Sequence, residues 1–249
     1  MSATKIAILF LGALRGQEPA ESSVTTHPNV VWNCGVPKTV ALTYDDGPDP
    51  KHTAEILDVL RDEKIKATFF VVGSKLGRKE EQDVLKRIHA DGHTVGNHSW
   101  AHRDPLGMSI PEICADIKKT DEKIKKLIGV TPRLFRPPFG SATTHMADAL
   151  GKKIVLWNLD IQDLACRTPE EAADRLELEI EINQITDQPI ILLQHDTHPN
   201  TAQAQKKIIS VFRNLGYSFL PPAFLPSALI AVPVAGTTCT PIKHCLDSD

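Results

Sequence analysis

The sequence lacks a long apolar segment and a cluster of basic residues. The apolar run near its start, residues 6–14, is shorter than the roughly 20 residues that a membrane-spanning helix needs. Lys and Arg number 28 against 31 Asp and Glu, a net charge of −3, and no basic stripe stands out. These absences argue against a membrane span, and against nucleic acid or an anionic membrane surface as a partner.

The sequence also lacks two cysteines at C-x-x-C spacing. None of the five cysteines forms a C-x-x-C pair, which argues against a zinc ribbon or a thioredoxin-like redox site. Cys34 precedes the predicted core, whereas Cys239 and Cys245 lie near the end of the chain. A disulfide that ties the end to the start is one interpretation for a secreted protein. The odd number leaves at least one thiol free, and the pairing among these three, Cys114 and Cys166 stays open.

The first residues allow two interpretations. Lys5 precedes the apolar run, which resembles a secretory signal and predicts a secreted or cell-wall protein. Residues 14–16, Leu-Arg-Gly, form a poor cleavage site, so a packed N-terminal helix or strand is the alternative. Residues 17–38 carry Pro, Ser, Thr and Asn without periodicity and predict an extended lead-in. We therefore treat 1–37 as a segment that precedes the main domain.

From residue 39 onward, short apolar strands alternate with helical patterns, in a chain of 249 residues that is long enough for one large α/β domain. Strands are predicted at 39–44, 67–72, 93–96, 134–136, 154–158, 189–194 and 217–220. Helices are predicted at 52–63, 80–90, 111–128, 143–150, 169–184 and 200–215. This alternation favours a mainly parallel sheet. With no dinucleotide-binding glycine motif, it predicts a distorted (β/α) barrel, closed on itself, with about seven parallel strands.

We expect this barrel to be a single domain over residues 38–220, and the protein to be a monomer. Residues 221–249 are rich in proline and hold two cysteines. They predict a tail packed on the domain rather than a second domain. No internal repeat or low-complexity linker is visible.

Two adjacent carboxylates, Asp45 and Asp46, end the first predicted strand. Gly47 and Pro48 break the backbone directly after them. Both side chains can then face one site, although side chains along a strand alternate. One carboxylate could hold a cation while the other handles a proton. A surface turn is the plain alternative, because Asp, Gly and Pro are common in turns.

Two histidines four residues apart, His98 and His102, form the second candidate. At this spacing both can reach one cation from a helical turn or a tight loop. With one aspartate they make a two-histidine, one-carboxylate site that leaves positions open for water and substrate. Two solvated loop histidines are the alternative. Residues 97–99 also form a glycosylation sequon, but a glycan there would crowd the proposed metal.

Arg136 follows an apolar strand and precedes two prolines, Phe139 and Gly140. Proline fixes φ, so this loop is rigid. A rigid loop suits a guanidinium that must hold a carboxylate, and a backbone N–H that faces a developing oxyanion. A stiff surface turn with a salt-bridged arginine is the alternative.

Two further strand ends carry acids and a histidine. Asp160 and Asp163 follow strand 154–158, and His195 and Asp196 end strand 189–194. In barrels of parallel strands, the chemistry lies at the carboxyl ends of the strands. An acid beside His195 would raise its pKa and let it act as a general acid near neutral pH. A hydrogen-bonded structural histidine is the alternative.

Taken in this order, the five motifs resemble the polysaccharide deacetylase family, also called carbohydrate esterase family four or the NodB-homology domain. The resemblance covers about residues 38–220. It rests on Thr-Tyr-Asp-Asp-Gly-Pro at 43–48, His-Ser-Trp-Ala-His at 98–102 and Leu-Leu-Gln-His-Asp at 192–196. The spacing from Cys34 and the Ala-Thr-Phe-Phe-Val-Val run at 67–72 resemble the fungal chitin deacetylases.

The resemblance implies a metal and a base. Asp46, His98 and His102 would hold one divalent cation, usually zinc or cobalt in this family. Asp45 would be the general base, and Arg136 would orient it.

The resemblance also implies an acid and a substrate pocket. His195 would be the general acid, Asp163 would tune it, and the backbone N–H of Phe139 would help to hold the oxyanion. The expected substrate-binding residues are Tyr44, Pro138, Leu193 and Trp157. For Trp157, packing in the core is the plainer role.

Two positions depart from the family pattern. Family members usually carry Tyr where Phe139 stands, but the implied contact is a backbone group, so little is lost. They usually carry an aromatic residue where Leu164 stands, and that aromatic shapes the acetate pocket. The shape of the pocket and the substrate preference are therefore open.

The resemblance predicts a metal-dependent hydrolase that removes N-acetyl groups from N-acetylglucosamine residues of chitin or chitin oligomers, giving a chitosan-type product and acetate. An acetylxylan esterase or a peptidoglycan N-acetylglucosamine deacetylase with the same site is the alternative. A wall-binding module with a dead site would have lost a ligand, and none is lost here.

Overall fold

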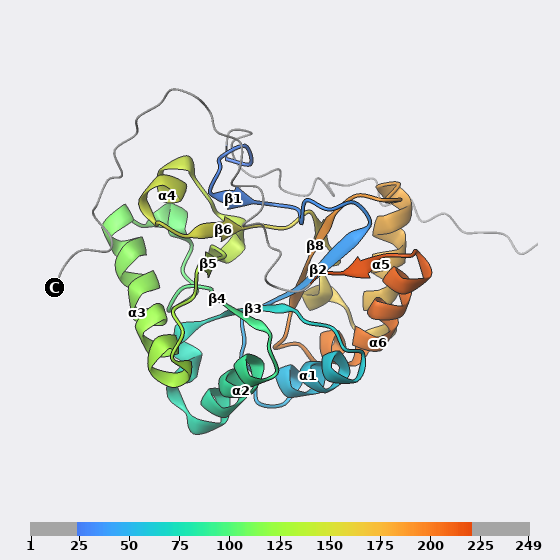
Figure 1. The fold of residues 1–249 in the computed structure, drawn as a ribbon, viewed down its shortest axis with the longest axis horizontal. Coiled ribbons are helices and arrows are strands. Elements are labelled where there is room, and N and C mark those ends of the chain that lie inside the picture. Colours follow the sequence, from blue (N-terminus) through green and yellow to red (C-terminus); the bar gives the residue numbers. More distant parts are fainter. Residues whose placement is uncertain (1–23, 221–249) are drawn as a thin grey trace, which may run out of the picture.

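The computed structural model describes residues 24–220, in which parallel strands lie inside a belt of helices (Figure 1). The strands belong to one sheet with the order β1-β6-β5-β4-β3-β2-β8-β7, and β9 pairs with the start of β2. All of these pairs are parallel. Within residues 24–220, no strand pairing joins β1 to β7. The predicted distorted (β/α) barrel is confirmed, with an opening where we expected closure.

The elements follow the predicted alternation. The strands are β1 (Val30–Val31), β2 (Thr39–Asp45), β3 (Thr68–Val71), β4 (Thr94–Asn97), β5 (Leu134–Phe135), β6 (Lys153–Val155), β7 (Leu159–Asp160), β8 (Ile190–His195) and β9 (Ser218–Phe219). The α-helices are α1 (His52–Asp62), α2 (Lys79–Ala90), α3 (Ile110–Ile128), α4 (Thr144–Ala149), α5 (Pro169–Ile182) and α6 (Pro199–Asn214). Short 3-10 turns are η1 (Gly73–Gly77), η2 (Pro105–Gly107), η3 (Pro138–Gly140) and η4 (Asp163–Ala165).

Two strands differ from the prediction. β1 lies inside the segment that we expected to be an extended lead-in without a sheet strand, and β7 follows a strand that ends earlier than expected. The strand predicted at 154–158 stops at Val155, because the carbonyl oxygens of Val155 and Leu156 accept hydrogen bonds from Arg136. A buried side chain thus takes two acceptors that a longer strand would use in its ladder.

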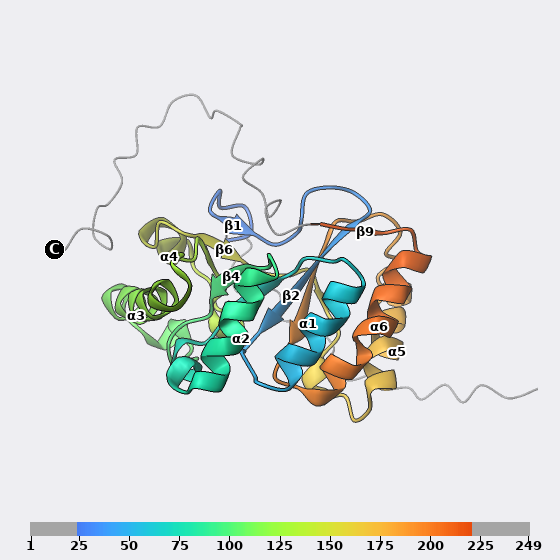
Figure 2. The ribbon, with the colours of Figure 1, turned by 60° about the horizontal axis from the view of Figure 1, so that its bottom comes forward.

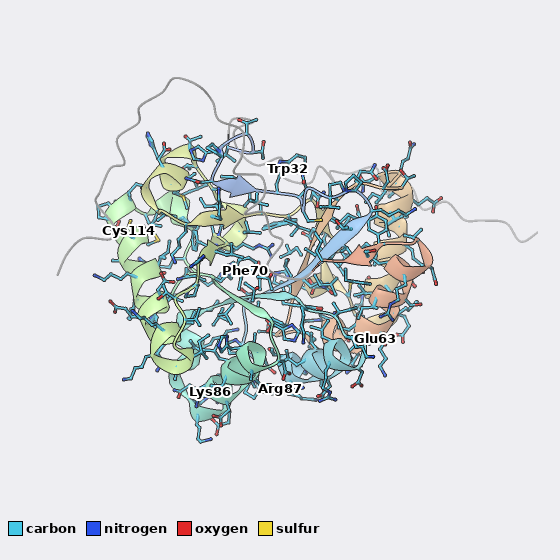
Figure 3. The ribbon with its side chains drawn as sticks, viewed as in Figure 1. Trp32, Glu63, Phe70, Lys86, Arg87 and Cys114 are labelled. Atoms are coloured by element: carbon cyan, nitrogen blue, oxygen red, sulfur yellow. The ribbon has the colours of Figure 1, made fainter. Side chains whose placement is uncertain are left out.

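β2 is the central strand, and all seven of its residues are buried. Val40, Leu42 and Tyr44 face the helices and pack in the larger core cluster with α1, α5 and α6. Because side chains along a strand alternate, Ala41, Thr43 and Asp45 face the barrel interior, where Ala41 packs with Phe70. Figure 3 shows Phe70 at the centre, with Lys86 and Arg87 at the outer rim. A strand buried on both faces is typical of a parallel sheet covered by helices.

The helices form a belt in which α4, α3, α2, α1, α6 and α5 contact one another in this order (Figure 2). α3 is the longest of those described. It starts at Ser109, whose capping box with Glu112 satisfies free backbone N–H groups, and it ends at Gly129, which has a positive φ of 76° and so suits a left-handed cap. Ile113, Ile117 and Ile124 lie on its buried side.

One cysteine expectation is wrong. Cys34 is a buried free thiol that contacts the carbonyl oxygens of Thr39 and Ile190, so it does not tie the chain start to the tail. Its thiol instead contacts the backbone at the starts of β2 and β8. The signal-like start at 1–16, the tail at 221–249 and its cysteines Cys239 and Cys245 lie outside the described residues. Within 24–220, no helix has both the length and the apolar character that crossing a bilayer requires.

Candidate active site

The strand register brings the predicted residues to one edge of the barrel. Asp45 at the end of β2 pairs with His195 at the end of β8. Asn97 at the end of β4 pairs with Phe135 at the end of β5, so the next residues, His98 and Arg136, leave the sheet side by side. In a parallel sheet all carboxyl ends lie on the same edge. Motifs up to 150 residues apart in the sequence therefore meet there.

Asp46, His98 and His102 form a cluster that fits a cation. One potential ligand atom of each lies within 4.8 Å of the others. Asp46 Oδ1 is 3.4 Å from His98 Nε2 and 3.1 Å from His102 Nε2, and it accepts no well-aligned hydrogen bond from the described residues. His98 Nδ1 lies 2.7 Å from the carbonyl oxygen of Arg136. A carbonyl only accepts, so Nδ1 donates, which leaves the Nε2 lone pair of His98 facing Asp46.

The charges of this cluster are strongly coupled. Burial alone would raise the pKa of Asp46, but His102 and His98 outweigh burial and lower this pKa well below its usual range. The same carboxylate raises the pKa of His102. An ionised carboxylate together with two imidazoles is a set of ligands that suits a divalent cation.

Backbone strain concentrates in the loops around this cluster. Eight non-glycine residues in the described part of the chain have a positive φ, a conformation that costs ordinary residues roughly 1–2 kcal/mol. Five of them belong to the loops at the carboxyl edge, namely Asp46, Ser99, His102, Phe139 and Gln162. Such strain persists where surrounding contacts hold a functional loop in place.

On one side of the cluster lies the Asp45–Arg136 flank. Arg136 Nη1 donates to Asp45 Oδ1 and to the Thr43 hydroxyl, at 2.8 Å each. The guanidinium is completely buried and lies 4.3 Å from the centroid of the Phe70 ring. Burial lowers the pKa of Arg136, and the charge of Asp45 opposes this. The second oxygen, Asp45 Oδ2, lies 3.8 Å from His98 Nε2 and so faces the cluster.

The second flank, the His195–Asp163 flank, lies at the end of β8, whose last residue pairs with Asp45. His195 Nδ1 is 2.7 Å from Asp163 Oδ1, while the backbone N–H of His195 and the Thr201 hydroxyl donate to Asp163 Oδ2. Burial alone would lower the pKa of His195. The hydrogen bond and charge of Asp163, with smaller contributions from Asp45 and Asp46, outweigh burial and raise the pKa to about 9. His195 is therefore protonated at neutral pH.

One predicted substrate contact is wrong. Tyr44 is completely buried in the core cluster, and its hydroxyl donates to Gln205 of α6. It alternates with Asp45 along β2 and therefore points away from the site. The sequence could have indicated this, because adjacent strand residues face opposite sides.

The other predicted pocket residues lie near the site with different exposures. Leu193 is buried two residues before His195 on the same face of β8, and Pro138, directly before Phe139, is buried. Trp157 is half-buried and packs with the barrel interior. The Phe139 ring is 62% exposed and meets His102 edge to face, with ring centroids 4.9 Å apart. Leu164 is also exposed, directly after Asp163.

Three polar residues at the site were missed by the sequence reasoning. Thr43 contacts Arg136, Thr201 contacts Asp163, and Asn97 contacts Ser99 in the loop between the two histidines. Thr43 could have been found, because it shares the inward face of β2 with Asp45. Asn97 is fully buried and its side-chain nitrogen donates twice within the chain. The folded protein therefore has no room for a glycan on this residue.

The glycine after the two aspartates is required by a close approach. A Cβ atom at Gly47 would lie 2.1 Å from a carboxylate oxygen of Asp196. Asp196 is completely buried, accepts a hydrogen bond from Thr53, and has its pKa raised to about 7 by burial. The turn after Asp46 can pack onto the end of β8 only without a side chain.

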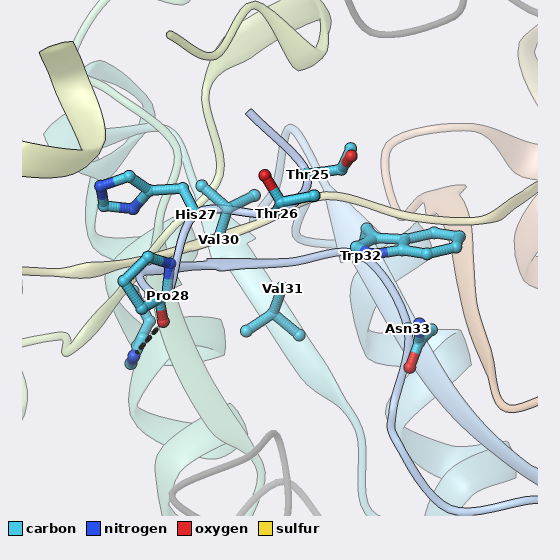
Figure 4. Close-up of a pocket in the computed structure, with 9 residues that line it drawn as sticks. Thr25, Thr26, His27, Pro28, Val30, Val31, Trp32 and Asn33 are labelled. Atoms are coloured by element: carbon cyan, nitrogen blue, oxygen red, sulfur yellow. Dashed lines mark hydrogen bonds between the residues drawn. The ribbon is translucent and has the colours of Figure 1, made fainter. Parts of the chain in front are cut away.

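A surface hollow of about 200 Å³ lies beside β1, away from these residues (Figure 4). Trp32 forms one wall, and His27 and Lys153 are among its polar lining residues. These polar groups are already paired within the chain, since His27 contacts Asp148 and Lys153 donates to the carbonyl of Pro28. We assign no ligand to this hollow.

Comparison with known proteins gives one family. A sequence model of the polysaccharide deacetylase family matches residues 33–154. The chain is 33% identical, over 224 residues, to a peptidoglycan N-acetylglucosamine deacetylase of Bacillus cereus, covering 83% of this chain and 80% of that protein. It is 36% identical to a peptidoglycan N-acetylmuramic acid deacetylase of Bacillus subtilis but spans only 38% of that protein's length.

A fungal protein is similar in both sequence and structure. The chain is 32% identical to a chitin deacetylase of Colletotrichum lindemuthianum, covering 75% of this chain and 79% of that protein. The solved structure of the chitin deacetylase from this fungus superposes with a TM-score of 0.74, at 28% identity, covering 80% of this chain and 92% of that one.

Proposed function

The chain belongs to the polysaccharide deacetylase family, and from this premise we propose that it is a metal-dependent hydrolase that removes N-acetyl groups from amino-sugar polymers. One observation carries the proposal: the ligand atoms of Asp46, His98 and His102 converge within 4.8 Å at the strand ends that also carry Asp45 and His195. The nitrogen of an amide leaves poorly until it is protonated. Hydrolysis of the amide therefore needs a base and an acid on opposite sides of the bond that breaks.

The metal ligands and the base occupy one half of the site. A divalent cation held by Asp46, His98 and His102, which we propose to be zinc or cobalt, would polarise the substrate carbonyl and make a water more acidic. Asp45 takes the proton of the attacking water, and its Oδ2 faces the cluster for this purpose. Arg136 holds the other oxygen, which fixes the carboxylate in one orientation.

The acid occupies the other half. His195 donates a proton to the leaving nitrogen, and a pKa of about 9 keeps the imidazole charged before that step. Asp163 holds Nδ1, so that the remaining ring nitrogen, Nε2, is the proton donor. The backbone N–H of Phe139 stabilises the oxygen that becomes negative when water attacks. Acetate and a free amine leave the site.

We propose N-acetylglucosamine units of chitin or its oligomers as the substrate. The TM-score of 0.74 with the fungal chitin deacetylase, over 92% of that chain, supports this choice. Peptidoglycan is the second candidate, supported by the 33% identity to the Bacillus cereus deacetylase over most of both chains. Both polymers belong to cell walls, so we propose that the protein is secreted or held in the wall. We also propose that it is a monomer.

Acetate release tests the proposal. The full chain is assayed on chitin oligomers, peptidoglycan and acetylxylan after chelation, and again after zinc or cobalt is added back. We expect acetate from chitin oligomers only when the metal is present. Acetate from peptidoglycan alone would mean that peptidoglycan, and not chitin, is the substrate of the same reaction. Acetate from acetylxylan alone would mean that the enzyme is an esterase. No acetate from any of the three would overturn the proposed function.

A further inference from the structure

Helix α3 is bonded to the loop that carries both candidate metal-binding histidines, residues 98–102, which we call the metal loop. Two acids and one carbonyl of α3 make these bonds. Asp116 accepts the backbone N–H of Trp100, while Asp121 and the carbonyl of Ile117 accept the side-chain N–H groups of Asn97 at 2.8 and 2.9 Å. Three hydrogen bonds thereby hold the helix to the metal loop and to Asn97, the residue directly before it, and the two that end on carboxylates are charge-assisted.

Asn97 is the joint of this connection, and its side chain has no spare hydrogen-bonding group. Its two N–H donors go to α3, and its oxygen accepts the backbone N–H of Ser99 at 2.8 Å. The residue is completely buried. A side-chain amide offers two donors and an acceptor, so it can satisfy a helix carboxylate, a helix carbonyl and a loop N–H at the same time.

The bonds continue from Asn97 to the second histidine. Ser99 adopts a positive φ of 68°, and its hydroxyl oxygen accepts the backbone N–H of His102 at 2.9 Å. His102 also has a positive φ, 53°. Each of these conformations is unfavourable for the isolated residue. The hydrogen bonds from Asn97 to Ser99 and from Ser99 to His102 hold them.

The far end of the connection is balanced by a lysine. Lys152 lies 2.7 Å from the other oxygen of Asp121, and both side chains are mostly buried. A buried carboxylate without this cation would be costly. The two histidines therefore have separate supports, because His98 is oriented by the carbonyl of Arg136 and His102 by the connection through Asn97.

We propose that Asn97 is a positioning residue for the metal ligand His102, held in turn by Asp121 and Lys152. The proposal rests on the metal site of the proposed function. Residues that orient a metal ligand typically change metal affinity 10–100-fold when they are replaced. The readout is therefore binding of Co²⁺ to the chelated full chain, measured by calorimetry, and not the rate of the loaded enzyme.

Asn97→Asp is the first variant, because it keeps the volume and the accepting oxygen. It removes both donors and sets a second carboxylate against Asp121. We expect Co²⁺ to bind 10–100-fold more weakly. The matched control is Asn158→Asp, since Asn158 also accepts a backbone N–H and donates to a backbone carbonyl, at 2.8 Å each, but at β8. The control should bind Co²⁺ as the wild type does.

Ser99→Ala is the second variant and decides the question if Asn97→Asp does not fold. It removes only the hydroxyl that accepts the N–H of His102, and we expect Co²⁺ affinity about 10-fold below that of the wild type. Wild-type affinity in both variants would overturn the proposal, as would an equal loss in Asn97→Asp and in the Asn158→Asp control. A wild-type chain that binds no Co²⁺ would instead overturn the metal site of the proposed function.

Discussion

The two flanks of the site hold their charges in different ways. In the Asp45–Arg136 flank, both side chains are at most 4% exposed, and the guanidinium is bonded to a carboxylate, a hydroxyl and two backbone carbonyls. In the His195–Asp163 flank, the carboxylate is equally buried, but the imidazole is 17% exposed. The first flank holds a fixed charge, whereas the second can exchange a proton with solvent.

This difference fits two separate tasks. A base that takes a proton from water must be fixed in direction before each turnover, which a buried arginine bonded to one carboxylate oxygen achieves. An acid that gives its proton away must recover one afterwards, which requires access to water. The protein assigns a rigid ion pair to the first task and a partly exposed histidine to the second.

Replacing the carboxylate of the rigid flank gives the largest expected effect. Asp45→Asn keeps the shape of the side chain but removes its capacity to accept a proton. We expect kcat for acetate release to fall by about 10²–10⁴-fold, while metal analysis still gives the wild-type content. Wild-type turnover in this variant would show that Asp45 is not the base.

Removing the cation of the same flank tests its rigidity. Arg136→Met leaves a buried carboxylate without its partner, and we expect a loss of roughly 3–5 kcal/mol in the free energy of unfolding, measured in urea. The control is Arg61→Met, where the arginine pairs with aspartates on the surface and we expect no measurable change. Equal stability of the two variants would mean that the buried pair is not a structural element.

The pH dependence of kcat/KM tests the proton that His195 carries in the other flank. His195 must be protonated to act, so kcat/KM of the wild type should fall as pH rises through about 9. In Asp163→Asn, the largest contributions that oppose the burial of the imidazole are lost, and this limb should move to about pH 6.5, the range of an ordinary histidine. The rate at pH 8 should then fall by about 30-fold.

Asp174→Asn is the matched control for the pH profile, because this aspartate is exposed on α5 and pairs with Lys207. Its profile should follow the wild type. An unchanged alkaline limb in Asp163→Asn would assign the proton donation to another group and remove the contrast between the flanks.

The smallest effect is expected between the flanks, at Phe139. Its proposed contribution is a backbone N–H, and its ring is exposed. Phe139→Tyr should therefore change kcat/KM for chitin oligomers by no more than about twofold. A tenfold change in either direction would show that the side chain takes part.

The sequence was sufficient to predict the barrel and the edge where its motifs meet. Each motif follows an apolar strand, and parallel strands end on one edge, so Asp45, Arg136 and His195 could be placed together without coordinates. The position of Tyr44 could have been predicted in the same way. Alternation along β2 turns it toward α6.

The supports of the site could not be predicted. Thr201 reaches Asp163 from 38 residues away, and Asn97 reaches Asp121 on a helix 24 residues later. These partners depend on how α6 and α3 dock, which no local pattern determines. β1 and β7 have two residues each, too few for periodicity, and β1 therefore falls inside the predicted extended lead-in.

Metal titration followed by acetate release tests the central claim most directly. The full chain is stripped of metal by chelation, and zinc is added in fractions of an equivalent while acetate release from chitin oligomers is recorded. The convergence of Asp46, His98 and His102 predicts no release without metal and a linear rise that stops at one equivalent per chain. Full acetate release by the stripped protein would contradict it.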